Sequence, residues 1–257
     1  MSFEYWYLMP IAMLIAILAN SSGFSGGVLF QPIFNLILNL PMHNAIATGI
    51  ATETIGMTSG AIRYILFKMV ELPIGFTMIM LTIPGVILGN YALIIVDEDL
   101  LKFILGFIIF GVATLQLVNA FRKTFGKKQN IPIEDIYRYM WVPPIGGFFS
   151  ATTGTGICEL AQPVLEKGLD IKTKRSNATA ILVEATGDWA ITILNLHAGL
   201  ILWDVWIFAG AGVLIGGQIG PFVSRYLPDK VLKIIFSLSV IVIGTFYIFK
   251  GIRWLLN

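Results

Sequence analysis

Apolar residues form long runs along this chain, and short polar connections separate the runs. Most runs contain about 20 residues, which is the length that an α-helix needs to cross the hydrocarbon core of a bilayer. The pattern predicts six complete spans, at about residues 44–66, 73–96, 100–121, 175–197, 203–223 and 230–255. A chain of 257 residues built in this way leaves no room for a separate soluble domain.

Two further apolar stretches, 5–38 and 141–166, are interrupted near the middle by glycine and hydroxyl residues. The first interruption runs from Gly23 to Gly27, and the second from Thr152 to Gly156. The arm on either side of each interruption is short for a complete crossing. We therefore predict two helix–break–helix hairpins that enter the membrane and return to the side from which they came.

The second half of the chain repeats the first. At a shift of 131 residues, residues 20–122 align with the later half without a gap. The matched pairs include Gly23 with Gly154, Gln31 with Gln162, Thr48 with Thr179, Glu53 with Glu184, and Gly89 with Gly220. Self-similarity of this kind indicates an internal duplication. It predicts a first membrane repeat at 1–121, a basic cytoplasmic linker at 122–140 and a second membrane repeat at 141–257.

A returning hairpin plus three crossings gives each repeat an odd number of crossings, so the two repeats should be inverted relative to each other. Lysine and arginine collect in short cytoplasmic loops, and with the N-terminus outside, the outer connections 39–43 and 197–204 contain neither residue. Only Lys250 and Arg253 oppose this orientation. The alternative, in which each hairpin is one full span, would place the acidic turn Asp97–Asp99 on the same side as the basic segment 167–175.

The expected fold is therefore an all-α integral membrane protein with two inverted repeats, each a broken re-entrant helical hairpin plus three transmembrane helices. Composition agrees, because 56% of the residues are apolar and only 12% are charged, far from the surface of a soluble domain. We expect a multi-pass protein of the cell membrane with both termini outside. The formal charge of +2 and the single cysteine, Cys158, suggest no nucleic-acid partner, no cofactor and no multi-cysteine metal site.

The two breaks are the first candidate site. A helix break in hydrocarbon is tolerated only where protein or a water-filled cavity covers it, and the unpaired N–H groups at the start of a helix attract anions. Two such helix starts meeting from opposite leaflets would make a compact anion site. The candidate substrate-binding residues are Ser22, Gly23, Ser25, Gly26, Gly27, Gln31 and Thr48 in the first repeat, and Thr153, Gly154, Thr155, Gly156, Gln162 and Thr179 in the second.

Each of these assignments has a structural alternative. The small residues could serve only to let helices pack closely, and the two threonines could bond to carbonyl groups of their own helices. Gln31 and Gln162 are either substrate contacts or struts that hold the opposing hairpin. The glycines that recur at Gly85 and Gly89, and at Gly212, Gly216 and Gly220, indicate close helix packing, either within one chain or across a homodimer.

Carboxyl groups inside predicted spans are the second candidate feature. Glu53 and Glu184 fall near the centres of their spans, and Asp188 lies one turn after Glu184. An intramembrane carboxylate is costly and suggests a functional role, so these residues, together with Glu159 in the second break, are candidates for carrying a proton. The alternative is that Glu53 and Glu184 pin the hairpin backbone, and Glu159 could likewise cap its own helix.

At these positions the sequence resembles the TauE/SafE family of sulfite exporters and related permeases. The likeness lies in the run Gly23–Gly27 followed by Pro32, in Ala45–Thr48, and in the second copy of this plan at Gly154–Pro163 and Ala178–Thr179. It covers essentially the whole chain. The resemblance implies transport of sulfur-containing anions such as sulfite, sulfonates or thiosulfate-like species, coupled to protons.

The expected function is thus a secondary transporter that moves a small anion by alternating access. A passive channel or uniporter for small anions or neutral solutes is the alternative, and it would need no proton site. An intramembrane enzyme would need a nucleophile with its base or a metal cluster in the core, and the two histidines, His43 and His197, are too peripheral for either.

Overall fold

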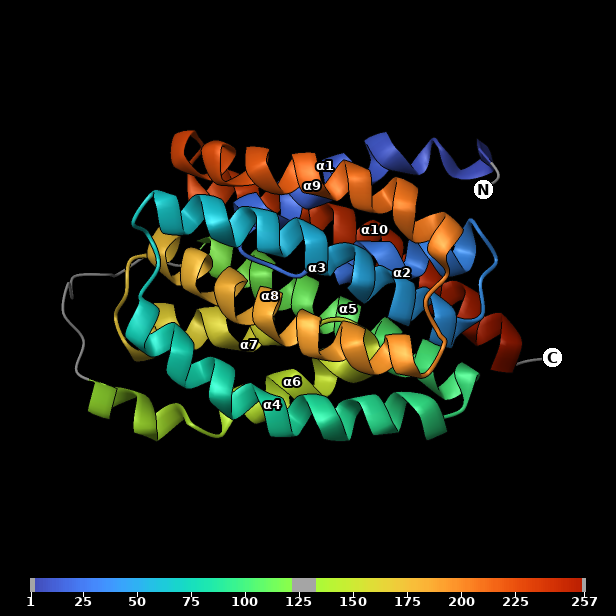
Figure 1. Ribbon diagram of the computed structural model, residues 1–257, viewed down its shortest axis with the longest axis horizontal. Coiled ribbons are helices and arrows are strands. Elements are labelled where there is room, and N and C mark those ends of the chain that lie inside the picture. The colour runs from blue at the N-terminus through green and yellow to red at the C-terminus, as the bar shows by residue number, and fades with distance from the viewer. Residues whose placement is uncertain (1–2, 122–132, 256–257) are drawn as a thin grey trace.

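A computed structural model describes residues 3–121 and 133–255 of the chain, and each regular element in these ranges is a helix (Figure 1). The first half contains η1 (Phe3–Tyr5), α1 (Leu8–Ser22), α2 (Gly27–Leu36), α3 (Met42–Leu66), α4 (Leu72–Ile95) and α5 (Glu98–Phe121). The second contains η2 (Ile133–Tyr139), α6 (Val142–Thr153), α7 (Ile157–Pro163), the π-helical turn η3 (Val164–Gly168), α8 (Thr173–His197), α9 (Trp203–Tyr226) and α10 (Asp229–Leu255).

Both expected hairpins break where glycine and hydroxyl residues interrupt the apolar pattern. Helix α1 ends at Gly23, whose backbone is left-handed with φ of 81°, and α6 ends at Gly154 with φ of 75°. Glycine adopts this conformation without the steric penalty that a side chain would bring. Short non-helical segments then lead into α2 and α7.

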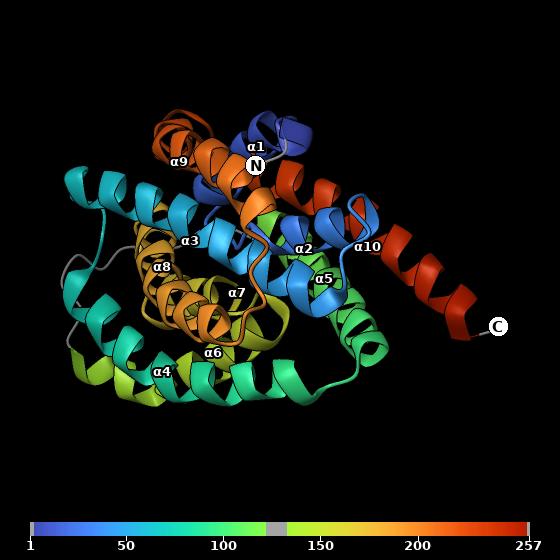
Figure 2. The ribbon, with the colours of Figure 1, turned by 45° about the vertical axis from the view of Figure 1, so that its right-hand side comes forward.

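Contacts between the two halves occur in matched pairs. Helix α1 packs on α9, and its counterpart α6 packs on α4. Helices α3 and α8 pack on each other at the centre, between α4 and α9 (Figures 1 and 2), and α5 packs on α10. Each hairpin is therefore held mainly by the other half of the chain, so that the two halves form one bundle.

Apolar side chains cover the outside of the bundle, whereas many polar side chains lie inside it. On α4, for example, Phe76 and Met80 are 61% and 62% exposed, and the exposed apolar residues continue along α5, α9 and α10. Buried polar residues include Gln31, Thr52, Asn90 and Asn195. A soluble monomer rarely exposes so much contiguous apolar surface, so this distribution fits a protein surrounded by lipid.

Of the described residues, two helices, α4 and α9, are both long and apolar enough to span a membrane by length and composition alone. Helices α3 and α8 are each 25 residues long, which is sufficient length for a crossing. Their low hydropathy has a structural reason, because their polar residues, among them Glu53 and Glu184, point into the bundle and are buried.

The glycine stripes are used within one chain. A side chain at Gly85 or Gly89 of α4 would overlap the carbonyl groups of Pro144 or Phe148 on α6. In the same way, side chains at Gly212 and Gly216 of α9 would overlap backbone carbonyl groups of α1. This settles the alternative left open by the sequence for these glycines: they allow α1 and α6 to approach α9 and α4 closely.

The connections between helices gather at two ends of the bundle. At one end the α3–α4, η3–α8 and α9–α10 connections meet, and Arg175 Nε lies 2.6 Å from Glu71 Oε1 there. At the other end Leu202 N donates to Thr48 Oγ1 at 3.0 Å, and η1 and the end of α10 also lie there (Figure 1). The distribution of lysine and arginine along the sequence predicted that these two groups of connections lie on opposite sides of the membrane. Residues 122–132, with most of the basic linker, lie outside the described residues.

Replacing Gly85 by alanine should lower the midpoint of thermal unfolding of the detergent-solubilised protein by several degrees. The new methyl group would press on the Pro144 carbonyl, and overpacking costs about 1–3 kcal/mol. Gly111→Ala in α5 is the matched control, because a Cβ there meets nothing within 4 Å. Equal midpoints for the two variants would contradict the packing described above.

Candidate functional site

The two breaks meet at the centre of the bundle. The Ser25 hydroxyl donates to the carbonyl oxygen of Gly154 at 3.0 Å, and the Gln31 amide donates to the same oxygen at 3.3 Å. A side chain on Gly27 would overlap this carbonyl group, and one on Gly154 would overlap the Gln31 amide. Glycine is therefore required at both positions for the two breaks to touch. In this structure the Gln31 amide joins the two hairpins through this hydrogen bond.

Glu53 reaches from α3 to the start of α2. Its Oε1 accepts a hydrogen bond from Gly26 N at 2.5 Å. Its Oε2 lies 3.0 Å from the Ser25 hydroxyl, whose single hydrogen is shared between this oxygen and the Gly154 carbonyl oxygen. The side chain is 2% exposed. The first N–H groups of a helix carry a partial positive charge, so a carboxylate at this place satisfies both the hydrogen bonds and the charge.

Glu184 does the same in the second half, from α8 to the start of α7. Its Oε2 accepts from Cys158 N at 2.5 Å, and its Oε1 accepts from the Ser150 hydroxyl at 3.2 Å. The residue is completely buried. Glu53 and Glu184 are counterparts at the repeat shift. In both halves, therefore, a buried glutamate accepts a hydrogen bond from a backbone N–H group at the start of a helix.

Glu159 joins the two breaks directly. Its Oε2 accepts from Gly156 N at 2.8 Å in its own break, and its Oε1 accepts from Ser25 N at 3.0 Å in the other. The carboxyl group thus caps its own helix, as one of its two expected roles required, and also holds the backbone of the first hairpin. Thr155 lies buried in the same break.

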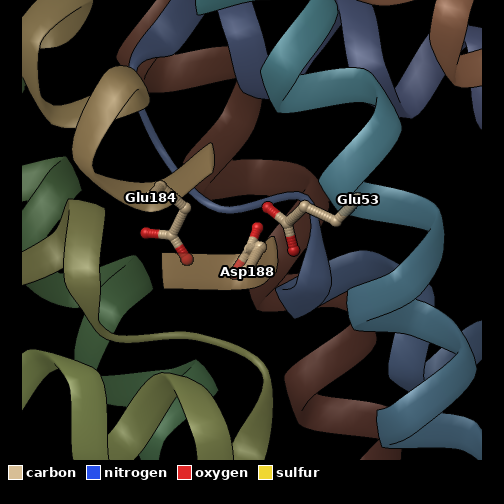
Figure 3. A group of neighbouring side chains, drawn as sticks. All are labelled: Glu53, Glu184 and Asp188. Atoms are coloured by element: carbon tan, nitrogen blue, oxygen red, sulfur yellow. The ribbon is translucent and has the colours of Figure 1, made fainter. Parts of the chain in front are cut away.

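Asp188 completes a cluster of carboxyl groups with Glu53 and Glu184 (Figure 3). One oxygen from each of the three lies within 4.8 Å of the others, and Asp188 is 1% exposed. Its Oδ2 has no hydrogen-bond partner among the described residues. Oxygens this close can share protons or hold a cation, and ionising them all would be costly in a buried site without a compensating positive charge.

Several ion pairs in the described part of the chain lie away from this cluster. They join Lys102 to Glu98 and Asp99, Arg175 to Glu71, and Lys233 to Glu166. The negative charge of the cluster is therefore offset by backbone N–H groups and hydroxyls, or by bound protons. A buried arrangement of this kind is sensitive to the arrival of any further anion.

The hydroxyls of four predicted site residues are engaged away from this cluster. Ser22 Oγ donates to Leu18 O at 2.7 Å, and Thr153 Oγ1 donates to Phe149 O at 2.8 Å, so both bond to their own helices. Thr48 accepts from Leu202 N at one end of the bundle.

Thr179 makes the corresponding bond at the opposite end, where its hydroxyl accepts from Glu71 N at 2.9 Å. Gln162 donates to Asn177 Oδ1, and a side chain at Gly23 would overlap that asparagine. Gln162 of α7 is therefore bonded to the residue of α8 that packs against the first break.

Ser150 and Asn177 are not among the residues predicted from the sequence, although both contact candidate residues. Their counterparts at the repeat shift are Ala19 and Ile46. A search for polar residues that recur in both halves cannot find residues that only one half has. A search for any polar residue flanking a break would have found Ser150.

Comparison with known proteins indicates that this chain is a membrane transporter. The model of the family described as "Sulfite exporter TauE/SafE" matches residues 8–247. The chain is 28% identical over 253 residues to "Probable membrane transporter protein ORF9" of Sinorhizobium sp, covering 94% of this chain and 90% of that protein. It is 22% identical over 242 residues to "Probable membrane transporter protein YdhB" of Bacillus subtilis (strain 168), covering 93% and 98%.

No solved structure matches the chain. The names of the family and of these relatives indicate a membrane transporter rather than an enzyme. The family match begins at the first residue of α1 and ends within α10. It therefore includes both breaks and all four central carboxyl residues, and the chain belongs to the TauE/SafE family of sulfite exporters.

Proposed function

We propose that this protein is a proton-coupled secondary transporter of small sulfur-containing anions such as sulfite, sulfonates or thiosulfate-like species. The family name supports the substrate class. The observation that carries the mechanism is the contact of the Glu53 carboxyl group with Gly26 N and the Ser25 hydroxyl. A carboxylate has the same hydrogen-bonding chemistry as a substrate oxyanion, so Glu53 occupies donors that an incoming anion would use.

Competition for these donors gives a coupling mechanism. An anion that binds to Gly26 N and Ser25 must displace the Glu53 carboxyl group, which then lies next to a new negative charge inside the cluster with Glu184 and Asp188. Protonation of a carboxyl group removes this repulsion. Anion and proton therefore bind together and cross the membrane in the same direction, and the substrate gradient and the proton gradient jointly set the direction of net transport.

The proposed architecture is that of two inverted repeats, with re-entrant hairpins that enter from opposite sides. It is supported by the matched contacts of α1 with α9 and of α6 with α4, and by the separation of the connections into two groups. The basic group, which includes Arg175 and Lys174, would face the cytoplasm by the distribution of positive charge. Both termini would then lie outside. Alternating access would move the hairpins relative to α3 and α8 and expose the breaks to each side in turn.

A channel would share these hairpins but would show no coupling. Glu53→Gln should reduce the accumulation of sulfite driven by an inward proton gradient in proteoliposomes by about tenfold or more, because a hydrogen bond to a charged group contributes about 1.5–3 kcal/mol and an amide cannot take up the proton. Equilibration without a gradient should be affected less.

The matched control is Glu98→Gln. Glu98 also accepts a backbone N–H, that of Met42 at 3.0 Å, but at the end of the bundle. Its replacement should leave accumulation within about twofold, since a partly exposed interaction contributes little. Accumulation by Glu53→Gln equal to that of the unchanged protein would indicate a channel or uniporter. Accumulation driven only by an outward proton gradient would indicate exchange of anion for proton.

Ser25→Ala should raise the sulfite concentration needed for half-maximal uptake about tenfold, because a lost hydrogen bond in a buried site costs about 1–3 kcal/mol. Ser22→Ala is the control, because the Ser22 hydroxyl donates to Leu18 O of its own helix. This substitution should change the half-maximal sulfite concentration less than about twofold, since the lost hydrogen bond does not involve the anion. The measurement is initial uptake rate against sulfite concentration. Equal shifts in the two variants would show that Ser25 has no special part in binding the anion.

A further inference from the structure

Two arginines, Arg63 and Arg225, lie at the end of the bundle where α3 and α9 finish. In the described part of the chain, neither Arg63 nor Arg225 forms an ion pair, whereas Arg175 nearby is paired with Glu71 at 2.6 Å. Arg225 is exposed, and Arg63 is partly exposed. Their positive charge is therefore available to a ligand from outside the chain.

Both guanidinium groups lie against the same pair of aromatic rings. The Arg63 guanidinium carbon lies 5.0 Å from the centre of the Phe222 ring, and that of Arg225 lies 4.6 Å from the centre of the Phe67 ring. The two rings meet edge to face with centroids 5.1 Å apart. Cation–π contacts of this kind orient a guanidinium group without neutralising its charge. We call Arg63, Phe67, Phe222 and Arg225 the Arg–Phe patch.

A second contact fixes Arg63 more firmly. Its Nε donates to Gln218 Oε1 at 2.9 Å, and the Gln218 amide donates to Ser59 O at 2.7 Å. The hydrogen bond uses one edge of the guanidinium group. The remaining N–H groups of a guanidinium form a planar fork, which suits the oxygens of a phosphate.

The surface next to the patch is apolar. Ile62 and Leu66 on α3 are exposed, as is Ile219 on α9, one turn before Phe222. Lys174 adds positive charge beside Arg225, whose carbonyl oxygen it contacts at 3.0 Å. A ligand for this place combines an anionic group with hydrocarbon chains.

We infer that the Arg–Phe patch binds the headgroup phosphate of an anionic phospholipid, whose acyl chains lie along Ile62, Leu66 and Ile219. The two arginines would share the phosphate, and the partly uncompensated charge would disfavour lipids whose headgroup also carries a cation. This binding site is separate from the central carboxyl cluster and does not depend on the proposed substrate.

The test is a titration of the purified protein in neutral detergent with dioctanoylphosphatidylglycerol, with bound lipid measured by native mass spectrometry. Dioctanoylphosphatidylcholine and glycerol phosphate are titrated in parallel. We expect the anionic lipid to bind more tightly than either. Arg63→Gln and Arg225→Gln should each weaken its binding about fivefold, and the double variant about 25-fold, since each basic residue near an anionic surface contributes roughly 1 kcal/mol.

Lys102→Gln is the charge-matched control, because this lysine is already paired with Glu98 at 3.0 Å at the opposite end of the bundle. It should bind the anionic lipid as the unchanged protein does. Because Arg225 is exposed, Arg225→Gln tests the site even where Arg63→Gln lowers thermal stability. Equal binding of the two lipids, or full binding by Arg225→Gln, would overturn the inference. Glycerol phosphate binding as tightly as the lipid would also overturn it and indicate a site for soluble anions.

Discussion

The structure depends on the pairing of backbone N–H groups at two helix breaks inside a membrane. Hydrocarbon offers no water to these groups, and each unpaired one costs several kcal/mol by the general scale for buried polar groups. The protein pairs them with its own glutamates: Glu53 at the start of α2, Glu184 at the start of α7, and Glu159 between the two breaks. The central position of α3 and α8, which carry two of these residues, follows from this requirement.

The same pairing makes the centre of the molecule responsive to charge. Glu53, Glu184 and Asp188 approach one another within 4.8 Å, and the cations found in ion pairs lie toward the ends of the bundle. Each hairpin is also held by the other half of the chain, through glycine contacts of α1 with α9 and of α6 with α4. The proposed coupling of anion movement to proton movement rests on this group of competing carboxyl groups within a closely packed frame.

The two halves of the chain carry different residues at several matched positions where they meet. At the repeat shift, Asp188 corresponds to Met57, Glu159 to Val28 and Ser25 to Gly156. The second half therefore supplies three of the four central carboxyl groups, while the first supplies the hydroxyl that contacts Glu53 and Gly154. A single repeat could not form this site, because each break is completed by residues of the other half.

The sequence alone was enough to place the helices and the two breaks, because apolar run length and glycine content are local properties of the chain. It also singled out Glu53 and Glu184, since an acid in a membrane span is rare. It could not tell which donors those acids meet, or that Thr48 and Thr179 are engaged at the bundle ends, or that Ser150 and Asn177 contribute. Those facts depend on which helices pack together, and contacts such as Ser25 with Glu159 join residues 134 positions apart. Only the tertiary structure decides them, because the partners of a buried polar group are chosen by packing across the whole chain.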